Sequence, residues 1–399
     1  MLDLDAAPAA APAPLPTPAS SAAPRVLGIR FTGSGSEYFR IWAVNLLLIL
    51  ITLGLYLPFA KARRIRYFYA NTLVDGQALS FHGDPWKMFR GFVLLVVLMG
   101  AYAGAGQVSK TAAFVAFLIL CAVWPALWRA SLQFRLGNTS WRGLRMRFDG
   151  KLKDAYLACA PSYLPAIALV TAGTLMAPDE PEAVKHLTAA MTVNLAGALV
   201  LLLLAPWSLA LFKRYQHNGY RFANQHAQVD LPVGKVYGLA LKTVGVALAP
   251  IGAGIALAFA SAGLAKSMGA GVDRGLFMVI VGAGGMLAYV LMFAVVLPYG
   301  AARMQNLAWN GTRSEALAFR SALSFTALFV LTLKNWVLTA LTLGLYRPFA
   351  AISTAKLRLE AVQIETQQDP ADWVAAANAG HADATGEIAG DFFGIDMGL

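Results

Sequence analysis

Eight long apolar stretches constrain the fold of this chain more than any other feature of its sequence. They lie near residues 41–59, 91–108, 112–128, 156–177, 188–212, 243–265, 275–298 and 322–346. The first seven contain no Asp, Glu, Lys, Arg or His, and Lys334 interrupts the eighth. A bilayer core about 30 Å thick is crossed by roughly 20 apolar residues in a helix, because backbone groups in lipid must be hydrogen-bonded within the segment. We therefore predict an all-α polytopic membrane protein.

Composition supports this class and excludes two others. Of the 399 residues, 58% are apolar and only 13% are charged, whereas soluble domains have about 25% charged residues. The chain is thus too apolar for a water-soluble globule, and a wholly disordered chain would need low hydrophobicity. The two cysteines form no CxxC pair, so neither a disulfide framework nor a zinc site is predicted.

Charge divides the chain into three parts. Residues 1–25 are rich in Ala and Pro and predict a disordered arm, and residues 361–399 predict an acidic polar tail. The membrane domain, 26–360, lies between them. The segment 25–358 holds 32 basic and 11 acidic side chains, a net charge of +21. Such an excess suits a surface that faces anionic lipid.

The connections between the apolar stretches differ strongly in charge. Loops 59–90, 129–155, 213–242 and 299–321 hold 21 basic residues together, whereas 109–111, 178–187 and 266–274 hold 4. By the positive-inside rule the first group is cytoplasmic. This pattern predicts a multi-pass protein of a bacterial inner membrane.

Two internal pseudo-repeats are visible. TLGLYLPFA at 52–60 recurs as TLGLYRPFA at 342–350, and Asn45 and Asn335 precede the two copies at the same offset. A second pattern recurs with identical spacing. It comprises Pro58, Asn71, Gly76, Phe81 and Gly83, then Pro125, Asn138, Gly143, Phe148 and Gly150, with looser matches at Pro298 and Asn310 and the motif proline Pro348.

Each part of the second pattern has a physical interpretation. Proline near the inner end of a span ends or kinks a helix, and the basic aromatic stretch after Pro58 suits a helix at the lipid headgroups. Asn71 and Asn138 are expected to end such helices in a left-handed conformation. The short runs that follow alternate apolar and polar residues, as half-buried strands do. We expect a small cytoplasmic β layer built from successive loops.

The repeats leave two topologies open. If 41–59 and 322–346 each cross the membrane once, eight segments span it and both termini lie outside. If both are re-entrant or interfacial hairpins, six helices span and both termini are cytoplasmic. We favour the hairpins because the strand-like run at 26–33 resembles runs assigned to the inside, and Lys334 would then lie at a hairpin tip.

Polar residues near the membrane give two groups of candidate contacts. Basic side chains suited to lipid headgroups are Lys61, Arg63, Arg64, Arg66, Arg145 and Arg147. Asn45 and Asn335 lie within apolar runs, where an unpaired amide is costly. Each asparagine either makes a hydrogen bond between helices or lines a polar cavity.

The segment EYFRIWAVNLLLILITLGLYLPFAKARRIRYFYANT at 37–72, followed by FHGD at 81–84, resembles the YjgN-like family of bacterial inner-membrane proteins. The resemblance covers most of 28–360. It implies a multi-pass inner-membrane protein of uncharacterised function, and it brings no established catalytic residues.

No motif in the sequence predicts chemistry. There is no HExxH, P-loop or GxSxG sequence, so we expect no enzyme activity, cofactor or metal. Expected partners are membrane lipids, mainly anionic, and not nucleic acid, while protein partners are not indicated. Transport or lipid handling is the favoured role, since internal repeats are common in transporters. The alternative is a non-catalytic envelope scaffold or interaction protein.

Overall fold

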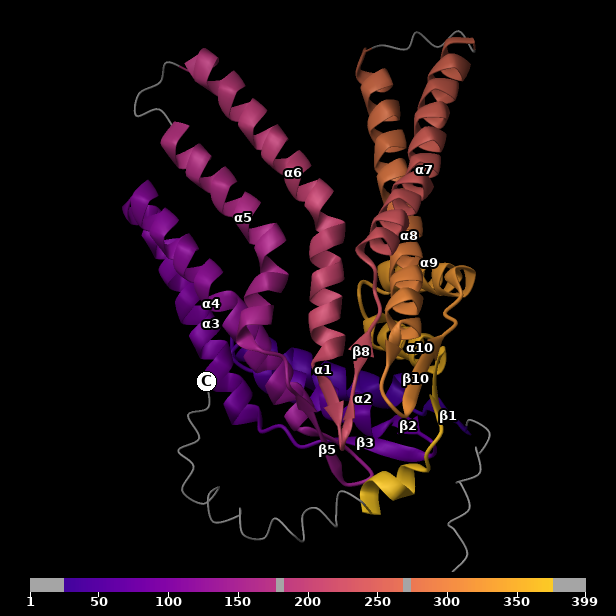
Figure 1. Cartoon of the computed structure of the whole chain (residues 1–399). Coiled ribbons are helices and arrows are strands. Elements are labelled where there is room, and N and C mark those ends of the chain that lie inside the picture. The colour runs from indigo at the N-terminus through magenta and orange to yellow at the C-terminus, as the bar shows by residue number, and fades with distance from the viewer. Residues whose placement is uncertain (1–24, 177–182, 268–273, 376–399) are drawn as a thin grey trace, which may run out of the picture.

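Six long apolar helices dominate the computed structural model, which describes residues 25–176, 183–267 and 274–375. They are α3 (Pro85–Val108), α4 (Lys110–Gly137), α5 (Leu152–Met176), α6 (Ala183–Asn218), α7 (Val233–Ser267) and α8 (Arg274–Asn310). All six are long and apolar enough to cross a membrane, and they extend from the same side of a layer of strands (Figure 1). The predicted polytopic membrane class is thereby confirmed.

Four shorter helices form two helix–turn–helix hairpins. The first comprises α1 (Gly35–Ile51) and α2 (Leu57–Ala70), and the second comprises α9 (Phe325–Leu341) and α10 (Arg347–Glu360). Both turns contain the Leu-Gly of the repeated motif with positive φ, for example 51° at Leu53 and 93° at Gly54. Lys334 lies inside α9, so its predicted place at the tip is wrong.

In the described part of the chain, eleven strands form one antiparallel sheet. They are β1 (Arg25–Phe31), β2 (Thr72–Val74), β3 (Gln77–Phe81), β4 (Thr139–Trp141), β5 (Leu144–Phe148), β6 (Tyr220–Phe222), β7 (Gln225–His226), β8 (Gln228–Val229), β9 (Thr312–Arg313), β10 (Leu317–Ser321) and β11 (Val362–Thr366). Their spatial order is β7-β6-β5-β4-β3-β2-β1-β11-β10-β9-β8. The edge strands β7 and β8 are joined through Ala227 alone, so the sheet is a nearly closed ring, which we call the strand ring.

Each helical hairpin is framed by two strands that are neighbours in the strand ring. The pairs are β1–β2, β3–β4, β5–β6, β8–β9 and β10–β11. Both ends of every hairpin therefore return to the strand ring. A segment that crossed the membrane once would leave its ends on opposite sides. The geometry thus agrees with hairpins at 41–59 and 322–346 and with six spanning helices.

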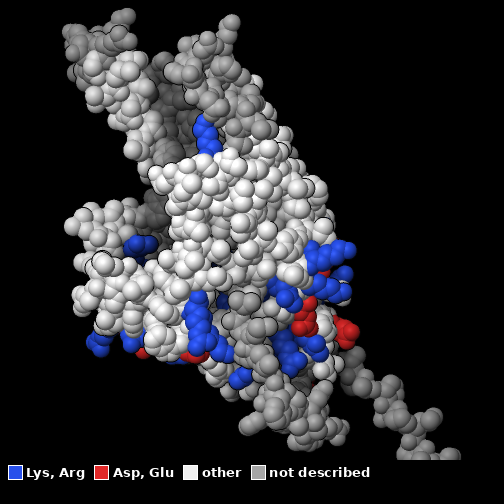
Figure 2. Space-filling model, turned by 90° about the vertical axis from the view of Figure 1, so that its left-hand side faces the viewer, with Lys and Arg blue, Asp and Glu red and all other residues white. Residues whose placement is uncertain are grey.

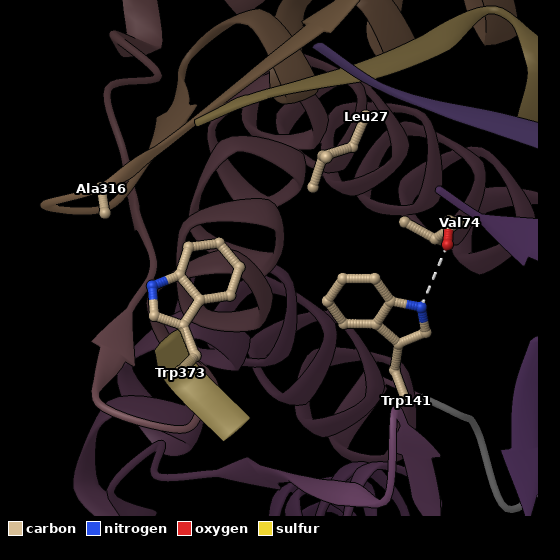
Figure 3. Packing of buried hydrophobic residues seen from close by; sticks show 5 residues of the cluster. All are labelled: Leu27, Val74, Trp141, Ala316 and Trp373. Carbon is tan, nitrogen blue, oxygen red and sulfur yellow. Dashed lines mark hydrogen bonds between the residues drawn. The ribbon is translucent and has the colours of Figure 1, made fainter. Parts of the chain in front are cut away.

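The interior of the strand ring is apolar. Leu27, Val74, Trp141, Ala316 and Trp373 form a buried cluster there (Figure 3), and the Trp141 indole Nε1 donates a hydrogen bond to the Val74 carbonyl at 3.2 Å. Trp373 comes from a short helix at 370–375 that follows β11. The folded domain therefore continues beyond residue 360, into the segment predicted as tail, while 1–24 and 376–399 lie outside the described residues.

A Phe-x-Gly motif recurs where β1, β3 and β5 pass into the next helix. Phe31, Phe81 and Phe148 are all buried. A Cβ atom placed on Gly33, Gly83 or Gly150 would lie 2.7, 2.3 or 2.5 Å from the ring of the phenylalanine two residues earlier. The glycine is therefore required because the aromatic ring occupies the space of a side chain.

The repeated prolines have two different positions. Pro58 and Pro348 lie in the first turn of α2 and α10, where proline has no hydrogen bond to lose. Pro125 and Pro298 lie inside α4 and α8. Neither helix ends at its proline. Both continue for about three further turns toward the strand ring.

The repeated asparagines end helices by a mechanism other than the predicted one. Asn71 and Asn138 have φ of −95° and −97°, so neither is left-handed. Instead, each side-chain Nδ2 donates to the carbonyl four residues earlier, at 2.9 and 2.7 Å. Asn310 differs, since its amide bonds to the backbone of Ser321. The left-handed residues lie in the β-hairpins instead: Asp75 and Gly76, with φ of 49° and 75°, and Arg142 and Gly143, with φ of 50° and 81°.

The Phe-x-Gly packing predicts that Gly150→Ala destabilises the protein. The new Cβ would meet Phe148 at 2.5 Å and Tyr215 at 2.9 Å, and both rings are buried. Overpacking of this kind costs about 1–3 kcal/mol. Thermal unfolding in detergent measures the effect. Gly91→Ala in α3, where nothing lies within 4 Å of the new Cβ, is the control and should not lower the melting temperature. Equal melting temperatures for the two variants would refute the packing account.

Candidate functional site

A basic groove of about 620 Å³ lies between α1 and α2. Its lining combines three arginines with apolar and aromatic side chains: Arg40, Ile41, Val44, Arg63, Arg66, Tyr67 and Ala70. We call this the arginine groove. It brings residues of α1 together with residues of α2 that lie 19 or more positions later in the sequence (Val44 to Arg63), because the turn at 52–56 folds α2 back against α1.

The predicted basic cluster on α2 is only partly in the arginine groove. Arg63 and Arg66 line it, whereas Lys61 and Arg64 are exposed outside the lining. Arg63 lies over the Tyr56 ring, 5.6 Å from its centroid. Arg66 is held by its Nη2, which donates to the Gly83 carbonyl at 3.0 Å. The two guanidinium groups are thus positioned by contacts with the Tyr56 ring and the Gly83 carbonyl.

Tyr67 forms the polar wall of the arginine groove. Its Oη accepts a hydrogen bond from the Ser34 N–H at 2.9 Å and lies 3.0 Å from the Ser34 carbonyl and 3.1 Å from Glu37 Oε2. Burial, opposed by the hydrogen bond from Ser34 and assisted by the Glu37 carboxylate, raises the pKa of Tyr67 to about 12. The phenol therefore stays neutral at physiological pH, and the groove keeps the full charge of its arginines.

Arg145 and Arg147 lie elsewhere. They occupy β5 and alternate with Met146, which packs on the apolar interior of the strand ring. Since successive side chains of a strand point to opposite faces, the two arginines are on the outer face, where both are exposed. The structure does not bring them to the arginine groove, and their contact with headgroups stays a prediction.

Asn45 and Asn335 are both buried but differ in their bonding. Asn335 Nδ2 lies 3.3 Å from Ser353 Oγ and 3.2 Å from Thr354 Oγ1 on α10. Asn335 therefore makes hydrogen bonds between α9 and α10, the first of the two interpretations given for this residue. Asn45 Oδ1 has no hydrogen-bond partner among the described residues. In the register of the TLGLY motif, Arg63 and Arg64 stand where α10 has Ser353 and Thr354.

Sequence reasoning missed Arg40 and one repeated contact. Arg40 lies on α1, far in sequence from the cluster on α2 whose groove it shares. The repeated contact joins a helix to the loop after the following β-hairpin: Arg66 to Gly83, Arg214 to Leu231 and Asn306 to Leu323, with side-chain nitrogen to carbonyl distances of 3.0, 2.9 and 3.0 Å. The constant spacing of 17 residues was a signal, but the change from Arg to Asn obscures it.

The described residues contain no group of three or more His, Cys, Asp and Glu that could hold a metal ion. The arrangement that they do show is a cationic groove beside apolar surface, on a protein with six candidate membrane spans.

Residues 26–392 match a family described as "Bacterial protein of unknown function (DUF898)". The chain belongs to this family. It is also similar to inner membrane protein YjgN of Escherichia coli O157:H7, with 31% identity over 152 residues, and to YjgN of Salmonella typhimurium strain LT2, with 29% identity over 127 residues. The matched segments cover 36% and 32% of this chain and the same shares of the two relatives, about a third of their length. No solved structure matches the chain.

These matches confirm the predicted YjgN-like resemblance and the location. The relatives are named inner membrane proteins, and the chain has six helices that can span a membrane. The protein is a multi-pass protein of the bacterial inner membrane, in a family whose function is not known.

The different bonding of the two asparagines predicts opposite effects of the same substitution. Asn335→Leu leaves the partly buried hydroxyls of Ser353 and Thr354 without this partner and should lower stability by about 1–3 kcal/mol. Asn45→Leu removes an unpaired Oδ1 and should leave stability unchanged or increased. Melting temperatures of both variants in the same detergent test this, and a larger loss for Asn45→Leu would contradict it.

Proposed function

We propose that this protein binds anionic phospholipid headgroups in the arginine groove, as part of a lipid-handling role in the inner membrane. The observation that supports it is the convergence of Arg40, Arg63 and Arg66 on one groove of about 620 Å³ with an apolar floor. Guanidinium groups bind phosphate through paired N–H donors. Ile41 and Val44 beside them provide a surface for the first part of an acyl chain.

The surroundings of the groove support a lipid ligand over a water-soluble one. The turns of the two short hairpins expose leucines, with Leu53 94% and Leu343 95% exposed. Figure 2 shows a broad uncharged band above a zone in which Lys and Arg gather. Exposed leucines are stable in hydrocarbon rather than in water, so α1 and α2 would enter the membrane from the side of the strand ring. The groove then lies at the headgroup level.

The comparison of the first and last hairpins also favours a binding role for the first. In the last hairpin Ser353 and Thr354 satisfy Asn335. In the first, arginines occupy the equivalent positions, and Asn45 Oδ1 lacks a partner. With arginines at these positions, the first hairpin lacks the hydrogen bond between asparagine and hydroxyl that the last hairpin has, and it gains positive charge. This difference favours a site that binds an anionic ligand.

Two further features belong to this proposal. The strand ring lies on the cytoplasmic side, because loops 59–90, 129–155, 213–242 and 299–321 hold 21 basic residues and all return to it. The five strand–helix–helix–strand units are internal repeats of one pattern, which the TLGLY and Phe-x-Gly motifs support.

A transport role is the second candidate, supported by the arrangement of helical hairpins around one strand ring. A solute moving through the ring would have to displace the apolar cluster that contains Trp141 and Trp373. Headgroup binding in the arginine groove requires no such rearrangement, so we place it first. No nucleophile–base set was identified in the sequence, so we propose a non-enzymatic role.

The orientation predicts the result of reporter fusions. Fusions at residues 1 and 399 should both report a cytoplasmic location, because both framing strands belong to the strand ring. A fusion at Ser109, between α3 and α4, should report the periplasm. A periplasmic signal at either terminus would contradict both the orientation and the hairpins.

The groove predicts selective retention of anionic lipid. Native mass spectrometry of the purified protein with equal phosphatidylglycerol and phosphatidylcholine should show preferential retention of phosphatidylglycerol. The double variant Arg40→Gln/Arg63→Gln should weaken that retention by about an order of magnitude, since charge-assisted hydrogen bonds are lost.

The matched control is Arg145→Gln/Arg147→Gln, which removes the same charge from the outer face of the strand ring. It should keep the preference for phosphatidylglycerol. Equal losses in the two double variants would show that net charge, and not the arginine groove, attracts the lipid. Unchanged retention in the groove variant would refute the proposed site.

A further inference from the structure

A second cationic cluster lies among the helices that lead back into the strand ring. These are the second helices of the five hairpins, α2, α4, α6, α8 and α10. Each is followed directly by a strand of the ring, so their C-terminal ends are held close together. Near those ends they carry Tyr69, Arg135, Lys213, Gln305 and Arg358, one on each helix.

Hydrogen bonds join two of these five side chains, and electrostatic interactions connect the others. Arg358 Nε donates to Gln305 Oε1 at 2.9 Å, and Gln305 Nε2 donates to the Arg358 carbonyl at 2.9 Å. The positive charges of Arg358 and Arg135 both act on Lys213. Arg135 and Tyr69 in turn both lie within electrostatic range of Tyr220, the first residue of β6. Groups from all five helices thus meet in one region.

This cluster has three cations and, among the residues that the structure describes, no acidic ion-pair partner. The ion pairs of the strand-ring residues join Arg25 and Arg142 to Asp75, Arg221 to Asp149, and Arg320 to Glu365. None of the described ion pairs includes Arg135, Lys213 or Arg358. Lys213 Nζ is within 3.5 Å of Gln216 Oε1, a neutral group. The one hydrogen bond described for Arg135 is at its backbone carbonyl, which accepts from Thr139 Oγ1 at 2.7 Å and leaves the guanidinium available.

Like charges brought together repel unless a ligand neutralises them, and here the fold brings them together from helices far apart in sequence. Arg135 and Arg358 are exposed while Lys213 is partly buried, so a ligand can approach the guanidinium groups and reach the ammonium. Two guanidinium forks and one compact ammonium are the donors that bind a phosphate group.

We propose that Arg135, Lys213 and Arg358 form an anion site that binds a phosphate group, separate from the arginine groove. The phosphate belongs either to free inorganic phosphate or to the monoester headgroup of a phosphatidate. Gln305 positions Arg358 through its two hydrogen bonds, and Gln216 positions Lys213. The proposal of this site rests on the contacts of these residues and is independent of lipid binding in the arginine groove.

The test is the thermal stability of the full chain in neutral detergent, measured with increasing inorganic phosphate against sodium chloride of equal ionic strength. A ligand that binds only the folded protein raises the melting temperature with concentration. A parallel series uses mixed micelles that contain phosphatidate or, as its control, phosphatidylcholine. A rise with phosphate identifies the free anion as ligand, and a rise with phosphatidate alone identifies the headgroup.

Lys213→Gln and Arg135→Gln are the decisive variants. Each removes a repelling charge, so the unliganded protein should be as stable as the wild type or more so. Each should weaken the ligand-dependent rise, with the apparent Kd increasing roughly tenfold or more as a charged contact is lost. Arg145→Gln, on the outer face of β5, should leave that Kd unchanged.

Three results would overturn the proposal. The first is a wild-type protein that neither phosphate nor phosphatidate stabilises beyond its control series. The second is a stabilisation that persists with unchanged Kd in Lys213→Gln and Arg135→Gln. A loss in the Arg40→Gln/Arg63→Gln protein alone would assign the phosphate to the arginine groove and would equally refute this site.

Discussion

The antiparallel pairing that nearly closes the strand ring holds the rest of the structure in place. An open sheet exposes unpaired N–H and C=O groups at both edges, and here the two edges meet at Ala227. The Ala227 N–H donates to the Tyr220 carbonyl at 2.9 Å, and Gln225 Oε1 accepts from the Ala316 N–H at 3.1 Å. Residues 225–227 therefore form hydrogen bonds with backbone groups on both edges of the sheet. Because every helical hairpin begins and ends in this ring, its closure fixes where α1, α3, α5, α7 and α9 begin and where α2, α4, α6, α8 and α10 end.

The ring depends on contacts between distant parts of the chain. Leu27 in β1 is opposite Ile364 in β11, so the first and last elements are direct neighbours. The apolar interior is completed by Trp373, which packs near Phe222 from the middle of the sequence. Such pairings form only when the whole domain is present. This explains why strands of two to seven residues are stable in a protein with so much helix.

The distribution of charge separates structural from available cations. The carboxylates of the ring are used in pairs, with Asp75 bound to both Arg25 and Arg142 at 2.9 and 2.7 Å. The cations of the arginine groove, and Arg135, Lys213 and Arg358 on the second helices of their hairpins, have no such partners among the described ion pairs. The first and last hairpins share one geometry but differ at Arg63 and Arg64 against Ser353 and Thr354. The same helical hairpin therefore carries hydrogen bonds between its two helices in the last copy and a cationic groove in the first.

Although it left six or eight membrane crossings open, the sequence indicated the membrane class, the long apolar stretches, the family resemblance and the presence of strands. It could do so because each depends on a local property: length of an apolar run, alternation, or a short motif such as Phe-x-Gly. Only the tertiary structure decided that the strands join into one ring, that Asn71 ends its helix through its side chain, and that Arg40 faces the cluster on α2. These depend on which distant segments come into contact, and local patterns do not encode distances across the fold. Tertiary contact likewise brought Trp373 from a segment predicted as tail into the core.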